Sequence, residues 1–327
     1  MRALLCKELG GPEKLLIEEV ADPVAGRGEV VIDVRAAGFN FPDLLIIQGK
    51  YQFTPPLPFS PGGEVAGRIA SLGEGVKGLR PRDRVTATTI FGGFAEKLKV
   101  SAAQVTPLPE SIPYEVGAGF TVAYGTSYHA LKQRAELKEG ESLLVLGAAG
   151  GVGLAAVEIG KAMGAKVIAA ASSDEKLETA RQHGADETIN YSQEDLKARA
   201  KALGGGGVDV VYDPVGGEYS EAALRALNRG GRHLVIGFAS GEIPRIRLNL
   251  TLLKECQIVG VYWGAWALRN PKDQAKNMAE LTALYDSGVI RPLISESYVL
   301  EDYLAAFESL AGRRAQGKLV LRLGPQD

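Results

Sequence analysis

The chain is poor in the side chains that bind metal ions. Its 327 residues include only two cysteines, Cys6 and Cys256, and three histidines, His129, His183 and His233. No pair of them has the spacing of metal ligands, and two distant cysteines are most simply thiols of the core or the surface. We therefore expect no metal site.

Neither sign of charge dominates, and no long apolar run is present. The 37 Lys and Arg residues and the 39 Asp and Glu residues give a net charge of -2, which argues against a broad nucleic-acid surface. Arg2, Lys7 and Glu8 interrupt the opening residues, so no signal peptide is predicted, and no apolar run reaches membrane-spanning length. We expect a cytoplasmic protein that binds neither nucleic acid nor membrane.

The most informative segment is glycine-rich and lies near the middle of the chain. Residues 142–153 read S-L-L-V-L-G-A-A-G-G-V-G, and a second apolar run, K-V-I-A-A-A, follows at residues 166–171. A strand, three glycines at a spacing of three, a helix and a second strand describe a dinucleotide-binding βαβ unit. Gly147 permits the turn, Gly150 lets backbone amides approach a pyrophosphate, and Gly153 allows the helix to pack on the sheet.

A pyrophosphate bound there lies at the helix N-terminus, where amides and the helix dipole favour negative charge. The predicted contacts come from consecutive positions of the turn and the first helical residues: Gly147, Ala149, Gly150, Gly151, Val152 and Gly153.

The pattern on either side of this segment predicts two domains. Residues 1 to about 120 contain short alternating strands separated by Gly and Pro, which favours a twisted antiparallel barrel. After residue 142, strands and helices alternate strictly, and six parallel strands make a doubly wound α/β sheet. We place a catalytic domain at residues 1–122 and 265–327, with the apolar tail at 317–323 crossing back to it. The dinucleotide-binding domain is expected at residues 123–264.

The end of the second strand favours NADPH over NADH. An NAD site usually has a carboxylate there for the ribose 2′-hydroxyl, but this chain has Ser172 and Ser173, and Asp174 comes late. Two hydroxyls followed by Lys176 suit a 2′-phosphate. In the alternative interpretation, Ser173 or Asp174 caps the next helix and Lys176 is solvated, and both roles are compatible. Tyr191, after the third strand, is expected to border the same pocket.

Four motifs together resemble the zinc-independent quinone oxidoreductase family, which includes zeta-crystallin, of the medium-chain dehydrogenase/reductase superfamily. They are G-F-N-F-P-D at residues 38–43, P-G-G-E-V-A-G at 61–67, P-R-D-R-V at 81–85 and G-A-A-G-G-V-G at 147–153. The resemblance covers essentially the whole chain. It implies a Rossmann doubly wound parallel sheet and a GroES-like antiparallel β-barrel domain.

The departures from the zinc alcohol dehydrogenases of that superfamily are informative. Asn40 stands where those enzymes carry a cysteine ligand, Gly63 stands before Glu64 where they carry a histidine, and the four-cysteine zinc lobe is missing. A catalytic zinc needs three protein ligands and an open position. The resemblance therefore implies NADPH-dependent reduction of a quinone or an α,β-unsaturated carbonyl without zinc.

The resemblance also assigns residues to the cofactor. It places Asn40, Thr126, Gly237, Phe238 and the segment near Trp263 around the nicotinamide half, and Ser172, Lys176 and Tyr191 around the adenosine phosphate. Gly216 and Lys318, the latter at a basic position near the end of family members, complete the predicted cofactor site.

Three residues are candidates for catalysis: Tyr51, Asn40 and Asp43. Residues 48–51 resemble a segment of enoyl thioester reductases in which a tyrosine donates a proton, and a hydroxyl beside the cofactor can do so. Tyr51 is otherwise an aromatic rim residue that lines an acceptor pocket with Phe53. We expect Asp43 to be a structural hydrogen-bonding residue, and Asn40 to orient substrate or ribose.

Two other functions remain open beside quinone reduction. One is an NADPH-dependent 2-alkenal, enone or enoyl-thioester reductase with Tyr51 as proton donor. The other is an NADPH-binding protein without enzymatic activity, crystallin-like or RNA-binding, although the balanced charge disfavours RNA. Apolar strands at residues 233–238 and 258–263 end the predicted sheet, and an uncovered edge there favours a homodimer joined through the Rossmann domains.

Overall fold

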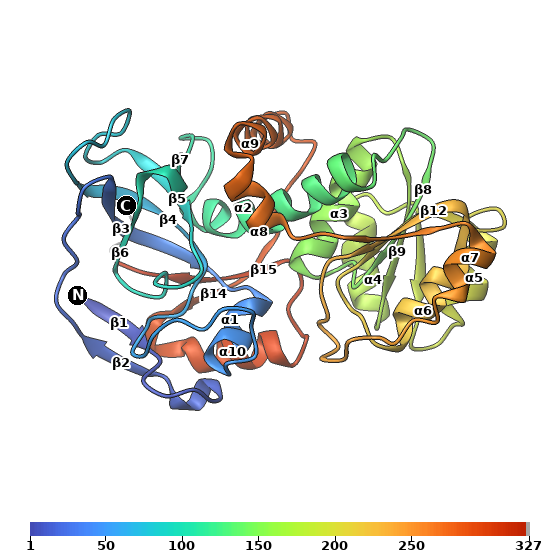
Figure 1. The fold of residues 1–327 in the computed structure, drawn as a ribbon, viewed down its shortest axis with the longest axis horizontal. Coiled ribbons are helices and arrows are strands. Elements are labelled where there is room, and N and C mark those ends of the chain that lie inside the picture. The colour runs from blue at the N-terminus through green and yellow to red at the C-terminus, as the bar shows by residue number, and fades with distance from the viewer. Residues whose placement is uncertain (325–327) are drawn as a thin grey trace. The chain divides into compact units, whose positions relative to one another are not determined.

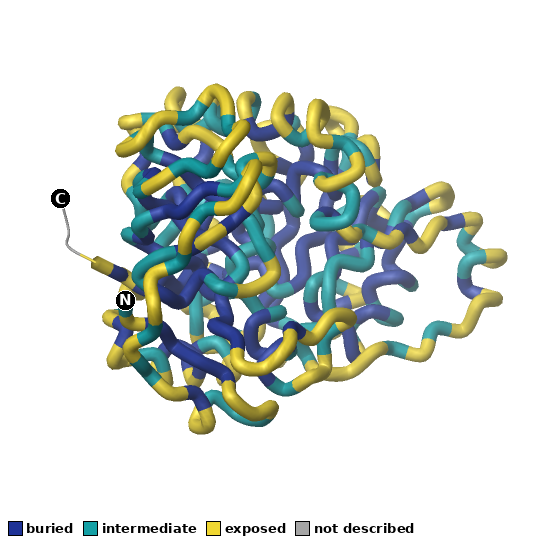
Figure 2. The backbone as a smooth tube through the Cα atoms, turned by 60° about the vertical axis from the view of Figure 1, so that its left-hand side comes forward, coloured by how far each residue is buried: buried dark blue, intermediate teal, exposed yellow. Residues whose placement is uncertain are grey.

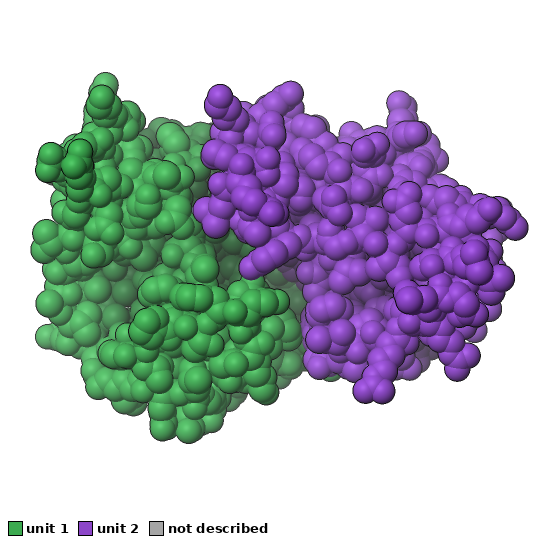
Figure 3. All heavy atoms as spheres, in the orientation of Figure 1, with its two compact units in different colours: residues 1–122, 292–327 green, residues 123–291 purple. Residues whose placement is uncertain are grey.

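The computed structural model describes residues 1–324, and the chain divides into two compact units (Figure 3). Unit 1 comprises residues 1–122 and the C-terminal segment that begins at Pro292, and unit 2 comprises residues 123–291. Helix α2 (Tyr114–His129) continues across the boundary between residues 122 and 123. Each unit has a sheet and a buried core of its own.

Unit 1 is built on a seven-stranded sheet in the order β14-β15-β3-β4-β5-β7, with β6 also paired to β3. The ten-residue β3 is long enough to pair with β4 along one side and with both β15 and β6 along the other. The strands are β3 (Glu29–Gly38), β4 (Glu64–Leu72), β5 (Arg84–Thr88), β6 (Lys97–Ser101), β7 (Val105–Pro107), β14 (Ile294–Val299) and β15 (Lys318–Arg322).

The C-terminal strand completes unit 1, as the sequence predicts, because β15 pairs antiparallel with β3. One pairing differs from the antiparallel pattern: β14 and β15 are parallel. Helix α10 (Tyr303–Ala311) lies between them in the sequence and provides the crossover that parallel strands need. The remaining elements of unit 1 are β1 (Arg2–Leu5), β2 (Leu16–Glu19), α1 (Phe41–Ile47) and the short helical turns Pro12–Lys14, Ala102–Gln104 and Leu300–Asp302.

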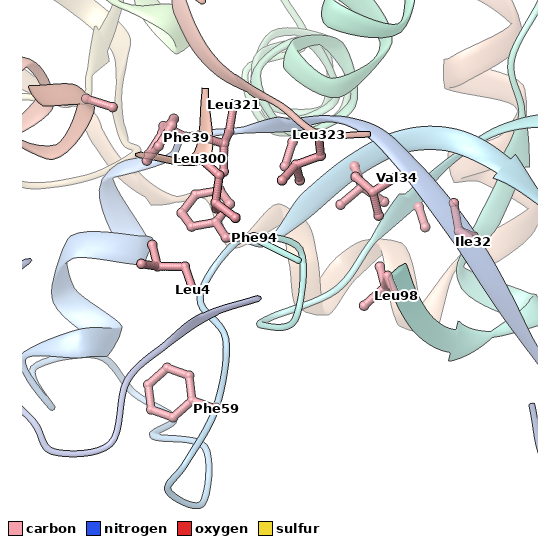
Figure 4. Packing of buried hydrophobic residues seen from close by; sticks show 14 of the residues in the cluster. Leu4, Ile32, Val34, Phe39, Phe59, Phe94, Leu98, Leu300, Leu321 and Leu323 are labelled. Atoms are coloured by element: carbon pink, nitrogen blue, oxygen red, sulfur yellow. The ribbon is translucent and has the colours of Figure 1, made fainter. Parts of the chain in front are cut away.

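Three phenylalanine rings lie at the centre of the unit 1 core. Phe39 packs against Phe94 with ring centroids 4.5 Å apart and against the edge of Phe307 at 5.3 Å. Phe39 and Phe94 lie among the aliphatic side chains of the core cluster (Figure 4). Burying a phenylalanine completely stabilises the fold by about 1.5–3 kcal/mol, so these rings fix α10 against the loops that flank the sheet.

Unit 2 contains a six-stranded parallel sheet in the order β10-β9-β8-β11-β12-β13, and the predicted doubly wound α/β fold is confirmed (Figure 1). The strand order reverses between β8 and β11, and ligands of such sheets bind outside the carboxyl ends of the strands at this point. The strands are β8 (Ser142–Leu146), β9 (Lys166–Ala171), β10 (Glu187–Asn190), β11 (Val208–Asp213), β12 (Leu227–Val235) and β13 (Gln257–Gly260).

In unit 2, strands β8, β9 and β11 are mostly buried, whereas β13 at the edge of the sheet is mostly exposed. Figure 2 shows how buried and exposed residues alternate along the backbone. Every residue of β8 is buried, which explains the continuous apolar run in the sequence. No helix within residues 1–324 is long and apolar enough to span a bilayer. The helices that begin in unit 2 are α3 (Gly151–Ala162), α4 (Asp174–Gln182), α5 (Leu196–Leu203), α6 (Glu218–Ala226), α7 (Asn249–Lys254), α8 (Trp263–Arg269) and α9 (Pro271–Asp286), with a π-helical turn at Ala130–Arg134.

The domain boundary lies later than the sequence suggests. The strand predicted at residues 258–263 ends at Gly260, and Trp263 begins α8. Helices α8 and α9 belong to unit 2, although residues 265–291 were expected in the first domain. The reason is their attachment to α2, where the Tyr128 hydroxyl donates a hydrogen bond to Glu280 at 2.7 Å.

Candidate functional site

At two of the three motif glycines in unit 2, the fold leaves no room for a side chain. Gly147 has a φ of +57°, and a Cβ there would lie 2.9 Å from Cγ2 of Val215. A Cβ at Gly153 would lie only 2.2 Å from the carbonyl oxygen of Gly147. The turn after β8 and the close packing of α3 therefore exclude any side chain at both positions.

Gly150 is different, because the fold does not require a glycine there. Its φ of -77° and ψ of 168° suit any residue, and a Cβ would meet only the Gly147 carbonyl oxygen, at an ordinary 3.5 Å. Gly150 is the N-cap of α3, and Gly151 and Val152 follow with the amides of the first turn. These surroundings are compatible with a pyrophosphate that approaches the backbone at Gly150, and the cofactor contact there stays a prediction.

The predicted 2′-phosphate residues lie together at the end of β9. The Ser173 hydroxyl accepts the Lys176 amide N–H at 3.4 Å and caps α4, so the capping role is confirmed for Ser173. The Lys176 ammonium donates to the Ser172 hydroxyl at 3.4 Å. A hydroxyl and an ammonium are thus presented side by side, as a phosphate requires.

Asp174, the first carboxylate after β9, forms a hydrogen bond with a residue of β10. Oδ1 of Asp174 accepts a hydrogen bond from the Asn190 side chain at 2.7 Å, which directs it toward the end of β10. Tyr191 follows β10, its amide bonds the Ala171 carbonyl at 3.1 Å, and its ring lies 4.4 Å from that of Tyr219. Tyr191 therefore lies beside the end of β9, and its contact with the adenosine phosphate stays a prediction.

A buried carboxylate that the sequence did not single out organises the next loop. Oδ1 of Asp213 accepts the amides of Val215 and Gly216, both at 2.9 Å. Its Oδ2 accepts the Ser220 hydroxyl at 2.5 Å and is 3.1 Å from Nε2 of His233. Burial raises the pKa of Asp213, but the hydrogen bonds, led by that of His233, outweigh burial and lower the pKa overall. The feature of the sequence that could have identified Asp213 is an aspartate at the end of an apolar strand, shortly before Gly216 and Gly217.

This loop brings together three predicted cofactor residues. Gly216 has a φ of +75°, and a Cβ there would lie 2.9 Å from the Phe238 ring. The Gly237 amide donates to the Asp213 carbonyl at 3.4 Å. Gly216, Gly237 and Phe238 thus share the carboxyl ends of β11 and β12.

The two remaining cofactor candidates in unit 2 are Thr126, which lies on α2, and Trp263, which begins α8. Thr126 precedes Ser127, whose hydroxyl donates to the Val152 carbonyl at 2.8 Å and joins α2 to the first turn of α3. Trp263, expected near the nicotinamide, is buried against Gly125, and its Nε1 donates to Gln274 at 3.0 Å. These contacts give Trp263 a packing role, and its contact with the nicotinamide stays a prediction.

In unit 1, a buried ion pair gathers the polar residues. The Lys318 ammonium donates to Glu64 Oε1 at 2.7 Å, to Asn40 Oδ1 at 2.7 Å and to the Phe39 carbonyl at 2.8 Å. The Asn40 side-chain amide in turn donates to Glu64 Oε1 at 2.9 Å. Glu64 and Lys318 are both buried, and the second carboxylate oxygen of Glu64 accepts the Val122 amide at 3.0 Å.

This cluster changes the role expected of Lys318. An ammonium has three N–H donors, and all three are used by acceptors within unit 1. Lys318 therefore positions Asn40 instead of binding the cofactor directly. Glu64 was missed as a site residue, although it stands in the P-G-G-E-V-A-G motif and follows two glycines.

Asp43 has the structural role that the sequence predicts. Its carboxylate accepts the Asn40 backbone amide at 2.7 Å at the start of α1. Burial raises the pKa of Asp43 to about 7, against the lowering effect of the hydrogen bonds from the Asn40 and Gly62 amides and of the Lys318 charge. Tyr51 lies in the loop after α1, half-buried against the core of unit 1. That position is compatible with both roles considered for it.

The chain was compared with known proteins. The family description "Alcohol dehydrogenase GroES-like domain" matches residues 26–110, and "Zinc-binding dehydrogenase" matches residues 151–283. The bovine quinone oxidoreductase-like protein 2 is 40% identical over 324 residues, which cover 98% of this chain and 92% of that protein. The chain belongs to the quinone oxidoreductase family.

Other members of the quinone oxidoreductase family agree along their whole length. The human quinone oxidoreductase is 36% identical over 328 residues, covering 99% of this chain and 98% of that protein. A crystal structure of the Escherichia coli quinone oxidoreductase complexed with NADPH superposes with a TM-score of 0.92 at 32% identity, covering 98% and 100% of the two chains. This membership in the medium-chain dehydrogenase/reductase superfamily indicates an oxidoreductase and confirms a GroES-like domain beside the Rossmann domain.

One matching description mentions zinc, and the quinone oxidoreductase resemblance places Asn40 where zinc enzymes have a cysteine ligand. Here the Asn40 side chain is held by Glu64 and Lys318. Among residues 1–324, no three His, Cys, Asp or Glu side chains are grouped as metal ligands.

The different surroundings of the motif glycines predict different effects of a single methyl group. Gly150→Ala should fold with nearly unchanged thermal stability but bind NADPH at least about tenfold more weakly, about 1.4 kcal/mol. Gly153→Ala should lose about 1–3 kcal/mol of stability, because its Cβ overlaps the Gly147 carbonyl. Thermal unfolding and calorimetric titration with NADPH measure the two effects. Wild-type NADPH affinity in Gly150→Ala would show that the pyrophosphate lies elsewhere.

Proposed function

We propose that this protein uses NADPH to reduce quinones or related electron-poor acceptors. The observation that carries the proposal is the arrangement of unit 2: Gly150 leaves space at the start of α3, and Ser172 and Lys176 lie together at the end of β9. The names of the bovine and human relatives and the NADPH complex of the E. coli protein support it.

In this proposal, unit 2 binds the charged phosphate groups of the cofactor. The amides at the start of α3 bind the pyrophosphate, and Ser172 and Lys176 bind the 2′-phosphate. The Asp213 carboxylate is a positioning group, because it fixes the amides of Val215 and Gly216 in the loop that follows β11. When bound, NADPH supplies a hydride.

Unit 1 contributes a fixed polar surface around Asn40. Lys318 and Glu64 hold both polar ends of the Asn40 side chain, so its amide has one orientation and can orient the acceptor or the ribose. A quinone that receives a hydride also needs a proton, which either water or the Tyr51 hydroxyl can provide. The alternative function, enone or enoyl-thioester reduction, depends on Tyr51 much more, because a proton must then be placed on carbon.

We also propose a homodimer joined through the edge of the unit 2 sheet. Within the described part of the chain, β13 is the end strand and pairs only with β12. Ile258 on β13 and Leu252 and Leu253 on α7 are large apolar side chains that are exposed. An unpaired strand edge beside exposed apolar side chains favours pairing with a second copy.

Anaerobic NADPH oxidation with matched quinones, enones and enoyl thioesters tests the function and its cofactor. We expect the highest kcat/KM with a quinone, and much slower use of NADH. Lys176→Ala should raise the KM for NADPH about tenfold, because it removes a hydrogen bond to a charged group, and should leave the KM for NADH unchanged. Lys272→Ala, an exposed lysine of α9, is the matched control. Faster oxidation of NADH than of NADPH would overturn the cofactor assignment.

Tyr51→Phe distinguishes the two reductase functions. For a quinone, we expect kcat to stay within about twofold of the wild type, because water can protonate the reduced oxygen. An enone reductase that uses the hydroxyl as an acid should lose about 100-fold in kcat. Both assays use the same protein preparation, and thermal unfolding controls for lost packing against the core. A large loss with quinones would assign Tyr51 as the proton donor in that reaction too.

The proposed dimer predicts the effect of a charge at the sheet edge. Ile258→Lys should shift the protein from dimer to monomer, because a lysine on an edge strand opposes strand pairing. Light scattering after size exclusion measures the mass, and NADPH titration checks that the cofactor still binds. The exposed Val24→Ala in unit 1 should remain dimeric. A monomeric wild type at micromolar concentration would refute the dimer.

A further inference from the structure

The segment that follows β10 is joined to the predicted 2′-phosphate residues at the end of β9. The Ser192 hydroxyl donates a hydrogen bond to the Ser172 carbonyl at 3.0 Å, one residue beyond the bond from the Tyr191 amide to the Ala171 carbonyl. Ser172 also presents its hydroxyl to the Lys176 ammonium. The end of β10 therefore fixes the backbone that carries the predicted phosphate contacts.

Asn190, the last residue of β10, is at the centre of this connection and is only 4% exposed. Its side-chain nitrogen donates to Oδ1 of Asp174 at 2.7 Å, and its side-chain oxygen accepts the Ser192 amide at 3.1 Å. Its backbone amide donates to Oε1 of Glu194 at 3.0 Å. A buried amide with hydrogen bonds at both polar ends has a single orientation, so the donor that Asp174 meets is fixed.

Asn190 binds two carboxylates, and only one of them is neutralised by a cation. Glu194 forms an ion pair with Arg199 at 2.5 Å. Asp174 begins α4, two positions after Ser172, and is exposed. Within residues 1–324, no lysine or arginine forms an ion pair with Asp174. Asp174 therefore keeps its negative charge close to the predicted phosphate site, and a neutral amide sets the direction of that charge.

The direction of the Asp174 carboxylate matters because the two nicotinamide cofactors differ in charge at this place. A carboxylate near the end of the second strand accepts the ribose 2′-hydroxyl of NADH and repels the 2′-phosphate of NADPH. The repulsion grows as the two negative groups approach each other. An Asp174 side chain turned toward Ser172 and Lys176 would also compete with the phosphate for the same donors. Its hydrogen bond to Asn190 opposes that rotation.

We propose that Asn190 is a specificity-determining residue: it holds the Asp174 carboxylate toward β10, and the site at the end of β9 thereby accepts a 2′-phosphate. The inference rests on the NADPH site of the proposed function but not on the identity of the acceptor. Asn190 is a positioning residue, since it acts on the phosphate through Asp174 and through the backbone of Ser172. Without Asn190, the freed carboxylate disfavours NADPH and leaves NADH unaffected.

Equilibrium binding of NADPH and NADH without an acceptor tests the proposal, because the two cofactors differ only in the 2′-phosphate. Asn190→Ala should weaken NADPH binding about three- to tenfold and change NADH binding less than about twofold. When Asp174→Ala is already present, adding Asn190→Ala should change the affinity for either cofactor less than about twofold, because the carboxylate is gone. Equal losses with both cofactors, or the same NADPH loss with and without Asp174, would overturn the proposal.

Two further variants keep the test decisive. Asn228→Ala is the matched control, because it removes another asparagine that donates to an aspartate of unit 2, Oδ1 of Asp209 at 2.8 Å, outside the predicted site. Its affinity for both cofactors should stay within about twofold of the wild type. Asp174→Ala alone covers the case in which Asn190→Ala does not fold, and it should not weaken NADH binding. A loss of NADH affinity of more than about threefold would show that Asp174 binds the ribose, and would overturn the proposal.

The same titrations separate this inference from the proposed function. A wild type that binds NADPH no more tightly than NADH would refute the cofactor assignment and this inference together. A wild type that prefers NADPH, but loses affinity on Asn190→Ala equally with and without Asp174, would refute only the role of Asn190. Because no acceptor is present, a protein that reduces no quinone can still show the coupling between Asn190 and Asp174. That result would support this inference and leave quinone reduction refuted by its own assay.

Discussion

The buried ammonium of Lys318 is the constraint on which the organisation of unit 1 depends. Lys318 begins the C-terminal strand β15, and it binds a carboxylate on β4 and a carbonyl and a side chain at the end of β3. A buried charge that loses its partner costs about 3–5 kcal/mol. Strand β15, the start of α1 and the Val122 backbone amide on α2 are therefore linked through Glu64 and Lys318.

Unit 2 uses a buried carboxylate in a comparable way. Asp213 ends β11 and accepts hydrogen bonds from two loop amides, a serine hydroxyl and a histidine ring. In both units a buried charge at one terminus of a strand fixes residues that the sequence predicts to contact a ligand: Lys318 starts β15 and holds Asn40, and Asp213 ends β11 and holds the Gly216 amide. Rigid positioning by groups that do not touch the ligand is the arrangement that a hydride transfer needs.

The sequence predicts what is encoded locally and misses what is joined across long separations. Strands β8 and β9 of unit 2 could be predicted because they are apolar runs bounded by turns, and the glycine motif could be predicted because its turn and helix packing exclude side chains. The pairing of Glu64 with Lys318 spans 254 residues and leaves no local pattern. The apolar run that contains Trp263 is equally compatible with a strand and a helix, and only its packing against α2 decides between them.

The polar cluster of Lys318, Glu64 and Asn40 in unit 1 has its hydrogen bonds satisfied internally, and this bears on the chemistry of the acceptor. The Lys318 ammonium donates to Phe39, Asn40 and Glu64, and the Glu64 carboxylate is buried beside it. The cluster therefore supplies a fixed amide at Asn40. An acceptor that is reduced at conjugated oxygen can take its proton from water, whereas one reduced at carbon needs a placed acid. The contribution of Tyr51 therefore depends on which of these two kinds of acceptor the protein reduces.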